Sequence, residues 1–213
     1  MVIIPDAGSN QFEEHAALES AGIDVLVIDH HEAEEISKHA CIINNQLCDY
    51  PTKSLSGAGM VYKFCSYIDK ILGTEFAENY LDLAALGIDA DVMSLTNFET
   101  RHIIKKGFEN VQNPMFETMC DKNAYSMGNS INPMSVAFYV APYINAAVRS
   151  GTMEEKEVIF NSMLKYKSYN LVPSTKRGCR GQTESLVEQA CRYMANIKNR
   201  QTKACDAGME YLE

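Results

Sequence analysis

Residues 25–31 read Val25-Leu26-Val27-Ile28-Asp29-His30-His31, a short apolar run that ends in one acid and two imidazoles. A run of this length and composition predicts a buried strand of a parallel sheet. Parallel-sheet enzymes carry their chemistry at the carboxyl ends of the strands. The stretch therefore predicts both an α/β fold and the place of its functional site.

Two further clusters of acids stand at comparable positions in the sequence. The apolar run over residues 2–5 ends in Asp6, and Asp89 and Asp91 follow Leu86-Gly87. Carboxylates and imidazoles are ligands for hard and borderline divalent cations. The three separated clusters predict a metal site that is assembled from several loops.

The first half of the chain has the pattern of a βαβ unit with additional elements. A strand over 2–6, a helix over 11–20 and a strand over 24–29 form this unit. A short polar helix over 32–39 and a third strand over 40–45 follow. Helices are expected over about 57–72, capped by Ser56, and over 74–86. The predicted fold class is α/β, with a parallel sheet flanked by helices.

The second half of the chain is predicted to be mostly helical and to end in a long connecting helix. The expected helices cover residues 98–108, 133–149 with a break at Pro142, 152–166 and 183–212, and a loop covers 173–181. We expect one domain over residues 1–150 and a helical extension over residues 151–213.

Composition restricts the class of protein. The chain has 213 residues, of which 46% are hydrophobic, and this content supports a real core. No apolar run reaches the roughly 18 residues that a membrane span needs, so no membrane association is expected. Seven cysteines are scattered without a Cys-x-x-Cys pair, which is typical of reduced thiols in a cytoplasmic protein.

Charge gives two opposing indications about nucleic acid. The formal net charge is −9, which does not suit nonspecific binding to a polyanion. One basic stretch lies between residues 165 and 180, and its side chains are Lys165, Tyr166, Lys167, Tyr169, Lys176, Arg177 and Arg180. Cations interleaved with aromatic rings suit a single-stranded nucleic acid, whereas the simpler interpretation is a solvated loop.

Several local patterns occur in one order along the chain. They are Pro5-Asp6-Ala7-Gly8-Ser9, Asp29-His30-His31, Tyr50-Pro51 with Leu55-Ser56-Gly57-Ala58-Gly59, Ala85-Leu86-Gly87-Ile88-Asp89-Ala90-Asp91-Val92, and Ile144-Asn145-Ala146-Ala147-Val148-Arg149. This ordered set resembles the DHH phosphoesterase superfamily, and within it the RecJ-type single-strand-specific 5′ exonucleases. The resemblance covers roughly residues 2–150, and it implies a DHH domain.

The resemblance implies a role for each matching residue. Asp6 corresponds to the acid that bridges two metal ions, His30 to a metal-ligating imidazole, and Asp91 to a further metal ligand. Asp29 would orient the site, and His31 would face the phosphate. These five residues form the candidate catalytic and metal centre.

The same resemblance implies a substrate and a cofactor. Asn145 and Arg149 would face the phosphates of the nucleic acid, and two ions of Mn²⁺ or Mg²⁺ would be bound in the complete protein. The implied activity is metal-dependent phosphodiester hydrolysis, by 5′-to-3′ degradation of single-stranded DNA in DNA repair or recombination. Two divalent cations can activate water and relieve the charge on the departing oxygen.

The sequence also departs from the family pattern. The first motif, a strand that ends in Asp-x-Asp, and the C-terminal substrate-binding domain are not found in it, so we expect a fragment whose activity in isolation is open. Tyr143 and Val148 stand where the family usually has Arg and Gly. Both changes put phosphate contact in doubt.

Other functions and plainer roles stay open. The chain could be a small-substrate DHH phosphodiesterase for oligoribonucleotides or cyclic dinucleotides, a pyrophosphatase, or a non-catalytic DHH-like scaffold. Asp6 alone could be a turn residue, and Asp89 competes with Asp91 as a ligand. The glycines after Ser56 could cradle a phosphate or serve a helix cap and close packing. His15 and His39 are expected on the surface.

Overall fold

The computed structural model describes residues 1–212, except for the side chains of residues 210–212. The chain forms two compact units, Met1–Asn110 and Val111–Glu213. The sequence places a domain boundary after residue 150 instead. How far the phosphoesterase domain itself extends along the chain stays a prediction.

A parallel sheet of β1 (Val2–Pro5), β2 (Val25–Asp29) and β3 (Cys41–Asn44) organises the first unit. β2 lies in the middle, with Val2 paired to Val25 and Asp29 paired to Asn44. Val27 and Ile28 are almost completely buried. The apolar run that marks the sequence is therefore a buried strand of a parallel sheet, as predicted, and the structure shows that it is the central one.

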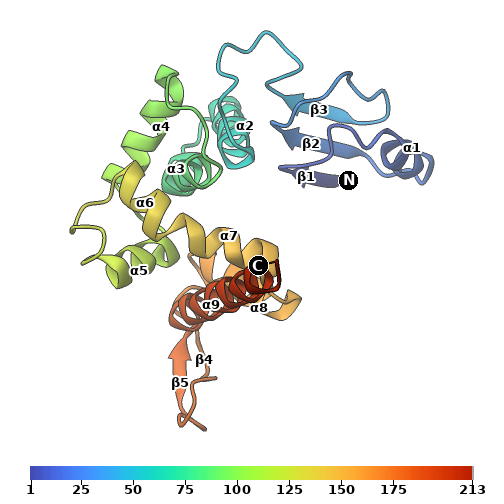
Figure 1. The fold of residues 1–213 in the computed structure, drawn as a ribbon. Helices are drawn as coiled ribbons and strands as arrows, with labels where there is room; N and C mark the ends of the chain where they lie inside the picture. Colours follow the sequence, from blue (N-terminus) through green and yellow to red (C-terminus); the bar gives the residue numbers. More distant parts are fainter. Residues whose placement is uncertain (213) are drawn as a thin grey trace. The chain divides into compact units, whose positions relative to one another are not determined.

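Helices α1 (Phe12–Ser20) and α2 (Gly57–Leu72) accompany the sheet. Figure 1 shows α1 beside the strands and α2 on the side toward which their arrowheads point. Ser56 caps α2, because its side chain accepts a hydrogen bond from the Gly59 amide at 3.3 Å. The predicted cap and helix are confirmed.

A short 3₁₀ turn, η1 (Ala77–Tyr80), leads into α3 (Leu81–Ala90), and α4 (Phe98–Glu109) packs on α3. The sequence predicts one helix over residues 74–86. The helix in the structure begins later and continues to Ala90, so Asp91 lies directly at its C-terminal end.

The second unit is mainly helical. Its helices are α5 (Pro114–Asn123), α6 (Pro133–Tyr139), α7 (Ala141–Ser150), α8 (Met153–Met163) and α9 (Leu186–Leu212). The predicted break falls at Val140, two residues before Pro142, because Pro142 suits only the first turn of the new helix. α7 and α8 pack along α9, which is the long helix that the sequence predicts.

An antiparallel pair, β4 (Leu171–Pro173) and β5 (Thr183–Ser185), precedes α9. The sequence predicts the loop between these strands but neither strand. Because each has only three residues, the alternation of side chains is too short to detect.

Two local predictions are wrong. Residues 32–39 form bends rather than a helix, since Ile36 is 57% exposed and the segment has no apolar face to bury. His15 is completely buried rather than on the surface, whereas His39 is exposed and lies 2.6 Å from Glu19.

The predicted fold class, a parallel sheet flanked by helices with a helical second half, is confirmed. Within residues 1–212, no helix is both long enough and apolar enough to cross a membrane.

Candidate metal centre

Asp6 follows β1 in a backbone conformation that is unusual for a side-chain-bearing residue. Its φ angle is +60°, and its amide donates a hydrogen bond to the Ile28 carbonyl at 2.9 Å. Asp tolerates this left-handed conformation better than most residues, and strained backbone of this kind is common at functional sites. The turn keeps Asp6 at the end of β1 beside the end of β2.

Asp29 ends β2 and is 1% exposed. Its carboxylate accepts hydrogen bonds from the amides of Ser9 at 3.1 Å and His30 at 2.8 Å, and it lies 2.7 Å from Nδ1 of His31. Burial alone raises the pKa of Asp29, but the hydrogen bonds from His31, Ser9 and His30 outweigh burial and hold the pKa well below its usual value. Asp29 is therefore charged, and its hydrogen bonds fix the residues around the end of β2.

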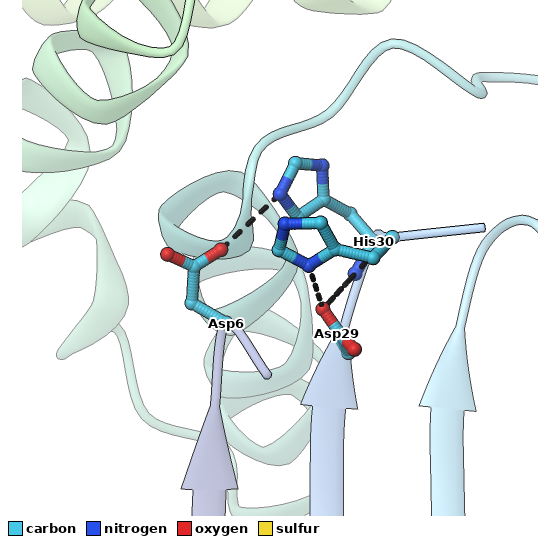
Figure 2. Close-up of side chains that lie close together, drawn as sticks. Asp6, Asp29 and His30 are labelled. Carbon is cyan, nitrogen blue, oxygen red and sulfur yellow. Dashed lines mark hydrogen bonds and ion pairs between the residues drawn. The ribbon is translucent and has the colours of Figure 1, made fainter. Parts of the chain in front are cut away.

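His30 is the point on which the exposed acids converge. Its Nε2 lies 3.2 Å from Oδ1 of Asp6 and 3.4 Å from Oδ2 of Asp91. Figure 2 shows the side chains of Asp6 and His30 pointing toward one another above the ends of β1 and β2. The hydrogen bond to Asp6 raises the pKa of His30, and the charge of Asp91 adds to this effect, although burial opposes it.

Asp91 caps the C-terminus of α3. A carboxylate there faces the negative end of the helix dipole, which disfavours it by about 0.3–1 kcal/mol at an exposed position. Helix stability thus gives no reason for an acid at this position, whereas the contact with His30 does. The predicted rival, Asp89, lies inside α3 and is buried, and burial raises its pKa to about 7.

Two glycines shape the site: Gly57, for which close packing was one of the expected roles, and Gly87, to which no role was assigned from the sequence. A Cβ atom on Gly57 would lie 2.1 Å from Oδ1 of Asp6, so the start of α2 and the Asp6 carboxylate occupy adjoining space. A Cβ on Gly87 would lie 2.4 Å from the Cβ of Ala58, so Gly87 lets α3 approach α2 closely. The Leu55-to-Gly59 and Leu86-Gly87 motifs contained this signal, but only the structure shows what the missing side chains would meet.

The predicted phosphate-binding residues lie on α7 in the second unit. Asn145 is half-buried there and Arg149 is exposed. The metal centre belongs to the first unit, and Asn145 and Arg149 belong to the second. The part that these two residues play in the site therefore stays a prediction. A mostly apolar cavity of about 590 Å³ lies between β3 and α2, and Asp6, Asp29, His30, His31 and Asp91 do not line it.

The donor set suits a divalent cation. Asp6, Asp29, His30 and His31 each offer a ligand atom, and these atoms all lie within 4.8 Å of one another. Asp91 adjoins this cluster, because its carboxylate contacts the imidazole of His30. Carboxylate oxygens with one or two imidazoles suit Mn²⁺ and also accommodate Mg²⁺. The arrangement has the chemistry of a hydrolytic metal centre.

Comparison with known proteins identifies related sequences. Residues 1–88 match the family model described as the DHH family, N-terminal domain. The chain is 42% identical over 210 residues to a protein provisionally named single-strand DNA-specific exonuclease YorK, from the SPbeta prophage of Bacillus subtilis strain 168. It is 31% identical over 154 residues to the single-stranded-DNA-specific exonuclease RecJ of the same organism.

These relatives are longer than the chain. The match to YorK covers 97% of this chain but 36% of YorK, and the match to RecJ covers 70% of this chain and 19% of RecJ. The chain thus spans about a third of the length of its YorK relative.

Solved structures confirm the fold. A crystal structure of exonuclease RecJ bound to manganese superimposes with a TM-score of 0.77 at 22% identity, over 99% of this chain and 49% of that one. RecJ of Thermus thermophilus in complex with Mn²⁺ gives a TM-score of 0.76 at 22% identity, over 99% of this chain and 29% of that one. By sequence, residues 1–88 are similar to the N-terminal domain of the DHH family, and the fold of the chain is similar to that of RecJ.

Proposed function

We propose that this chain provides the metal-dependent phosphodiesterase part of a 5′-to-3′ single-stranded DNA exonuclease that acts in DNA repair or recombination. One observation carries the proposal. Asp6, His30 and Asp91, from three separate segments, converge with atom separations of 3.2 and 3.4 Å. The names of YorK and RecJ as single-strand-specific exonucleases support the choice of substrate.

The residues of this centre divide the work. Asp6, His30 and Asp91 hold the divalent cations, Mn²⁺ or Mg²⁺, and the resemblance to the DHH phosphoesterases implies two ions. Bound cations of this kind lower the pKa of water and offset negative charge on the leaving oxygen. Asp29, buried and charged, fixes His31 through the 2.7 Å contact. The His31 side chain is 60% exposed and therefore accessible to a phosphate.

Asn145 and Arg149 complete the proposal as contacts to the phosphates of the DNA strand. An exposed guanidinium suits a phosphate because its planar donors match the phosphate oxygens.

All seven cysteines, which lie within the described residues, are free thiols, in keeping with a cytoplasmic protein.

Two separate measurements test the proposal. Calorimetric titration with Mn²⁺ measures metal binding, and chromatography measures nucleotide release from 5′-phosphorylated single strands, duplexes and dinucleotides. We expect Mn²⁺-dependent release of mononucleotides from the 5′ end of single strands, and its loss in His30→Ala. Cleavage of dinucleotides alone would replace the exonuclease with a small-substrate phosphodiesterase. Absence of Mn²⁺ binding would overturn the hydrolase in favour of a scaffold.

A further inference from the structure

The loop between β4 and β5 is ordered by its own backbone. The Cys179 amide donates to the Lys176 carbonyl at 3.1 Å, and the Gln182 amide donates to the Cys179 carbonyl at 3.0 Å. Gly178 and Gly181 supply the positive φ angles, +84° and +83°, that these two consecutive turns need. The side chains of the loop therefore project from a defined scaffold. Figure 1 shows the β4–β5 hairpin extending away from α9.

One buried acid ties this hairpin to α9. Glu184 of β5 has a 3% exposed side chain and accepts a hydrogen bond from the Thr175 amide at 3.1 Å. It also accepts from the Gln189 side chain at 3.3 Å and pairs with Arg192, both on the first turns of α9. These contacts fix the base of the hairpin against α9. The position of the hairpin tip within the second unit is therefore defined.

The tip carries an excess of positive charge. Between Ser174 and Gln182 there are three cationic side chains and no acid. Lys176 is balanced by Glu184, whose Oε2 lies 3.2 Å from its Nζ. Arg177 and Arg180 are exposed, and within residues 1–212 no acid forms an ion pair with either of them. The loop therefore presents two unpaired guanidinium groups, although the chain has a net charge of −9.

Exposed aromatic rings lie in the adjoining segment. Tyr166 and Tyr169 are 75% and 64% exposed. Their segment is held to the start of α9, because the Leu186 amide donates to the Asn170 carbonyl at 2.9 Å. Asn170 directly precedes β4, so these rings and the hairpin belong to one stretch of fixed backbone. Unpaired cations and exposed rings in one stretch of the chain suit a strand whose bases are unpaired.

From these observations we infer that the β4–β5 hairpin is a nucleic-acid-binding element, in which Arg177 and Arg180 bind phosphates of a single strand. Guanidinium groups favour phosphate because their donors form paired hydrogen bonds with its oxygens. The inference rests on the proposed single-stranded substrate, and it adds a contact that is separate from the metal centre.

Fluorescence anisotropy with a labelled oligothymidylate of about 20 nucleotides tests the inference on the full chain in EDTA, where no metal contributes. We expect the Arg177→Ala/Arg180→Ala double variant to bind about 10-fold more weakly at low salt. The slope of log K against log salt should become shallower by roughly 1.4, which corresponds to two lost phosphate contacts. Arg177→Lys/Arg180→Lys should recover part of the affinity.

The matched control is Lys105→Ala/Lys203→Ala, which removes the same charge at exposed positions on α4 and α9. It should change affinity by less than about 2-fold. Equal losses in both double variants, or no binding by the unmodified chain, would overturn the inference. So would a hairpin-dependent binding to vesicles of anionic phosphatidylglycerol without binding to the oligonucleotide.

Metal titration separates this inference from the proposed function. The hairpin variants should bind Mn²⁺ as the unmodified chain does. A chain that binds the oligonucleotide through the hairpin but binds no Mn²⁺ would overturn the hydrolase and leave the hairpin intact.

Discussion

The candidate metal centre and the β4–β5 hairpin have opposite electrostatic arrangements. At the ends of β1 and β2, the carboxylates of Asp6 and Asp91 gather around one imidazole, that of His30. At the base of the hairpin, the cations of Lys176 and Arg192 gather around one carboxylate, that of Glu184. The first region has a surplus of acids and attracts cations, whereas the second has a surplus of cations and attracts phosphates.

The two regions nevertheless share one principle. Each is built on a single buried carboxylate that is charged and accepts several hydrogen bonds, Asp29 in the first and Glu184 in the second. Each leaves its other charged groups more exposed. In each region the buried acid fixes the surrounding backbone, while the exposed charged groups are free to bind a ligand.

The largest effect is expected when the imidazole at the metal centre is removed. His30→Ala should weaken Mn²⁺ binding by at least about 100-fold, because loss of a ligand costs at least as much as loss of a supporting residue. Titration calorimetry measures the affinity. His39→Ala, at an exposed histidine paired with Glu19, is the control and should bind Mn²⁺ normally. Undiminished binding by His30→Ala would place the metal elsewhere.

The next largest effect is expected on stability, when Glu184, the buried acid of the hairpin, is replaced. Hydrogen bonds from Thr175, Gln189 and Lys176, with the charge of Arg192, outweigh burial and lower the pKa of Glu184 from 4.5 to about 2. A lowered pKa contributes stability that is present above pH 4.5 and is lost as the pH falls toward 2. Glu184→Gln should therefore cost about 2 kcal/mol at neutral pH.

Urea unfolding at several pH values measures this contribution. The difference in the free energy of unfolding between the unmodified chain and Glu184→Gln should shrink as the pH falls from 4.5 toward 2. Glu188→Gln, at an exposed acid in the first turn of α9, should show no such narrowing. A difference that stays constant with pH would show that the Glu184 charge does not stabilise the fold.

A single added carbon atom tests how tightly the metal centre is packed. Gly57→Ala places a Cβ 2.1 Å from the Asp6 Oδ1, so Asp6 must move. Mn²⁺ affinity should fall about 10-fold, while the melting temperature changes little. Gly208→Ala in α9 is the matched control, because no heavy atom lies within 4 Å of its added Cβ. If Gly57→Ala binds Mn²⁺ normally, the position of Asp6 is not critical.

The smallest expected effect concerns the proposed DNA contact on α7. Arg149 is exposed, so Arg149→Ala should lower affinity for a single-stranded oligonucleotide by about 3-fold through loss of one phosphate contact. Mn²⁺ affinity should not change. Anisotropy at two salt concentrations measures the loss. An unchanged affinity for DNA together with an unchanged salt dependence would remove Arg149 from the substrate-binding residues.

The sequence was sufficient to predict those parts of the molecule that rest on local pattern. The apolar run before Asp29 identified a buried strand of the parallel sheet, and Ser56 identified the start of α2. The order of the motifs brought Asp6, His30 and Asp91 into one hypothesis. Strand ends and helix caps depend mainly on residues nearby in the sequence. They can therefore be predicted from a single sequence.

Features that depend on packing were not predictable in the same way. The proximity of Gly57 to Asp6 involves two segments about fifty residues apart, and nothing in either segment specifies the distance. The hairpin strands were missed because three residues are too few to show an alternation of side chains. His15 is buried because α1 turns this residue toward the interior, although imidazoles are commonly exposed.

The left-handed backbone at Asp6 has a practical consequence for capturing a complex. With φ at +60°, position 6 accepts asparagine more readily than most other side chains. Asp6→Asn should thus preserve the turn and the shape of the side chain while removing its negative charge. Such a variant is the natural choice for crystallising the protein with an uncut strand, because its architecture is kept and its capacity to process the strand is withdrawn.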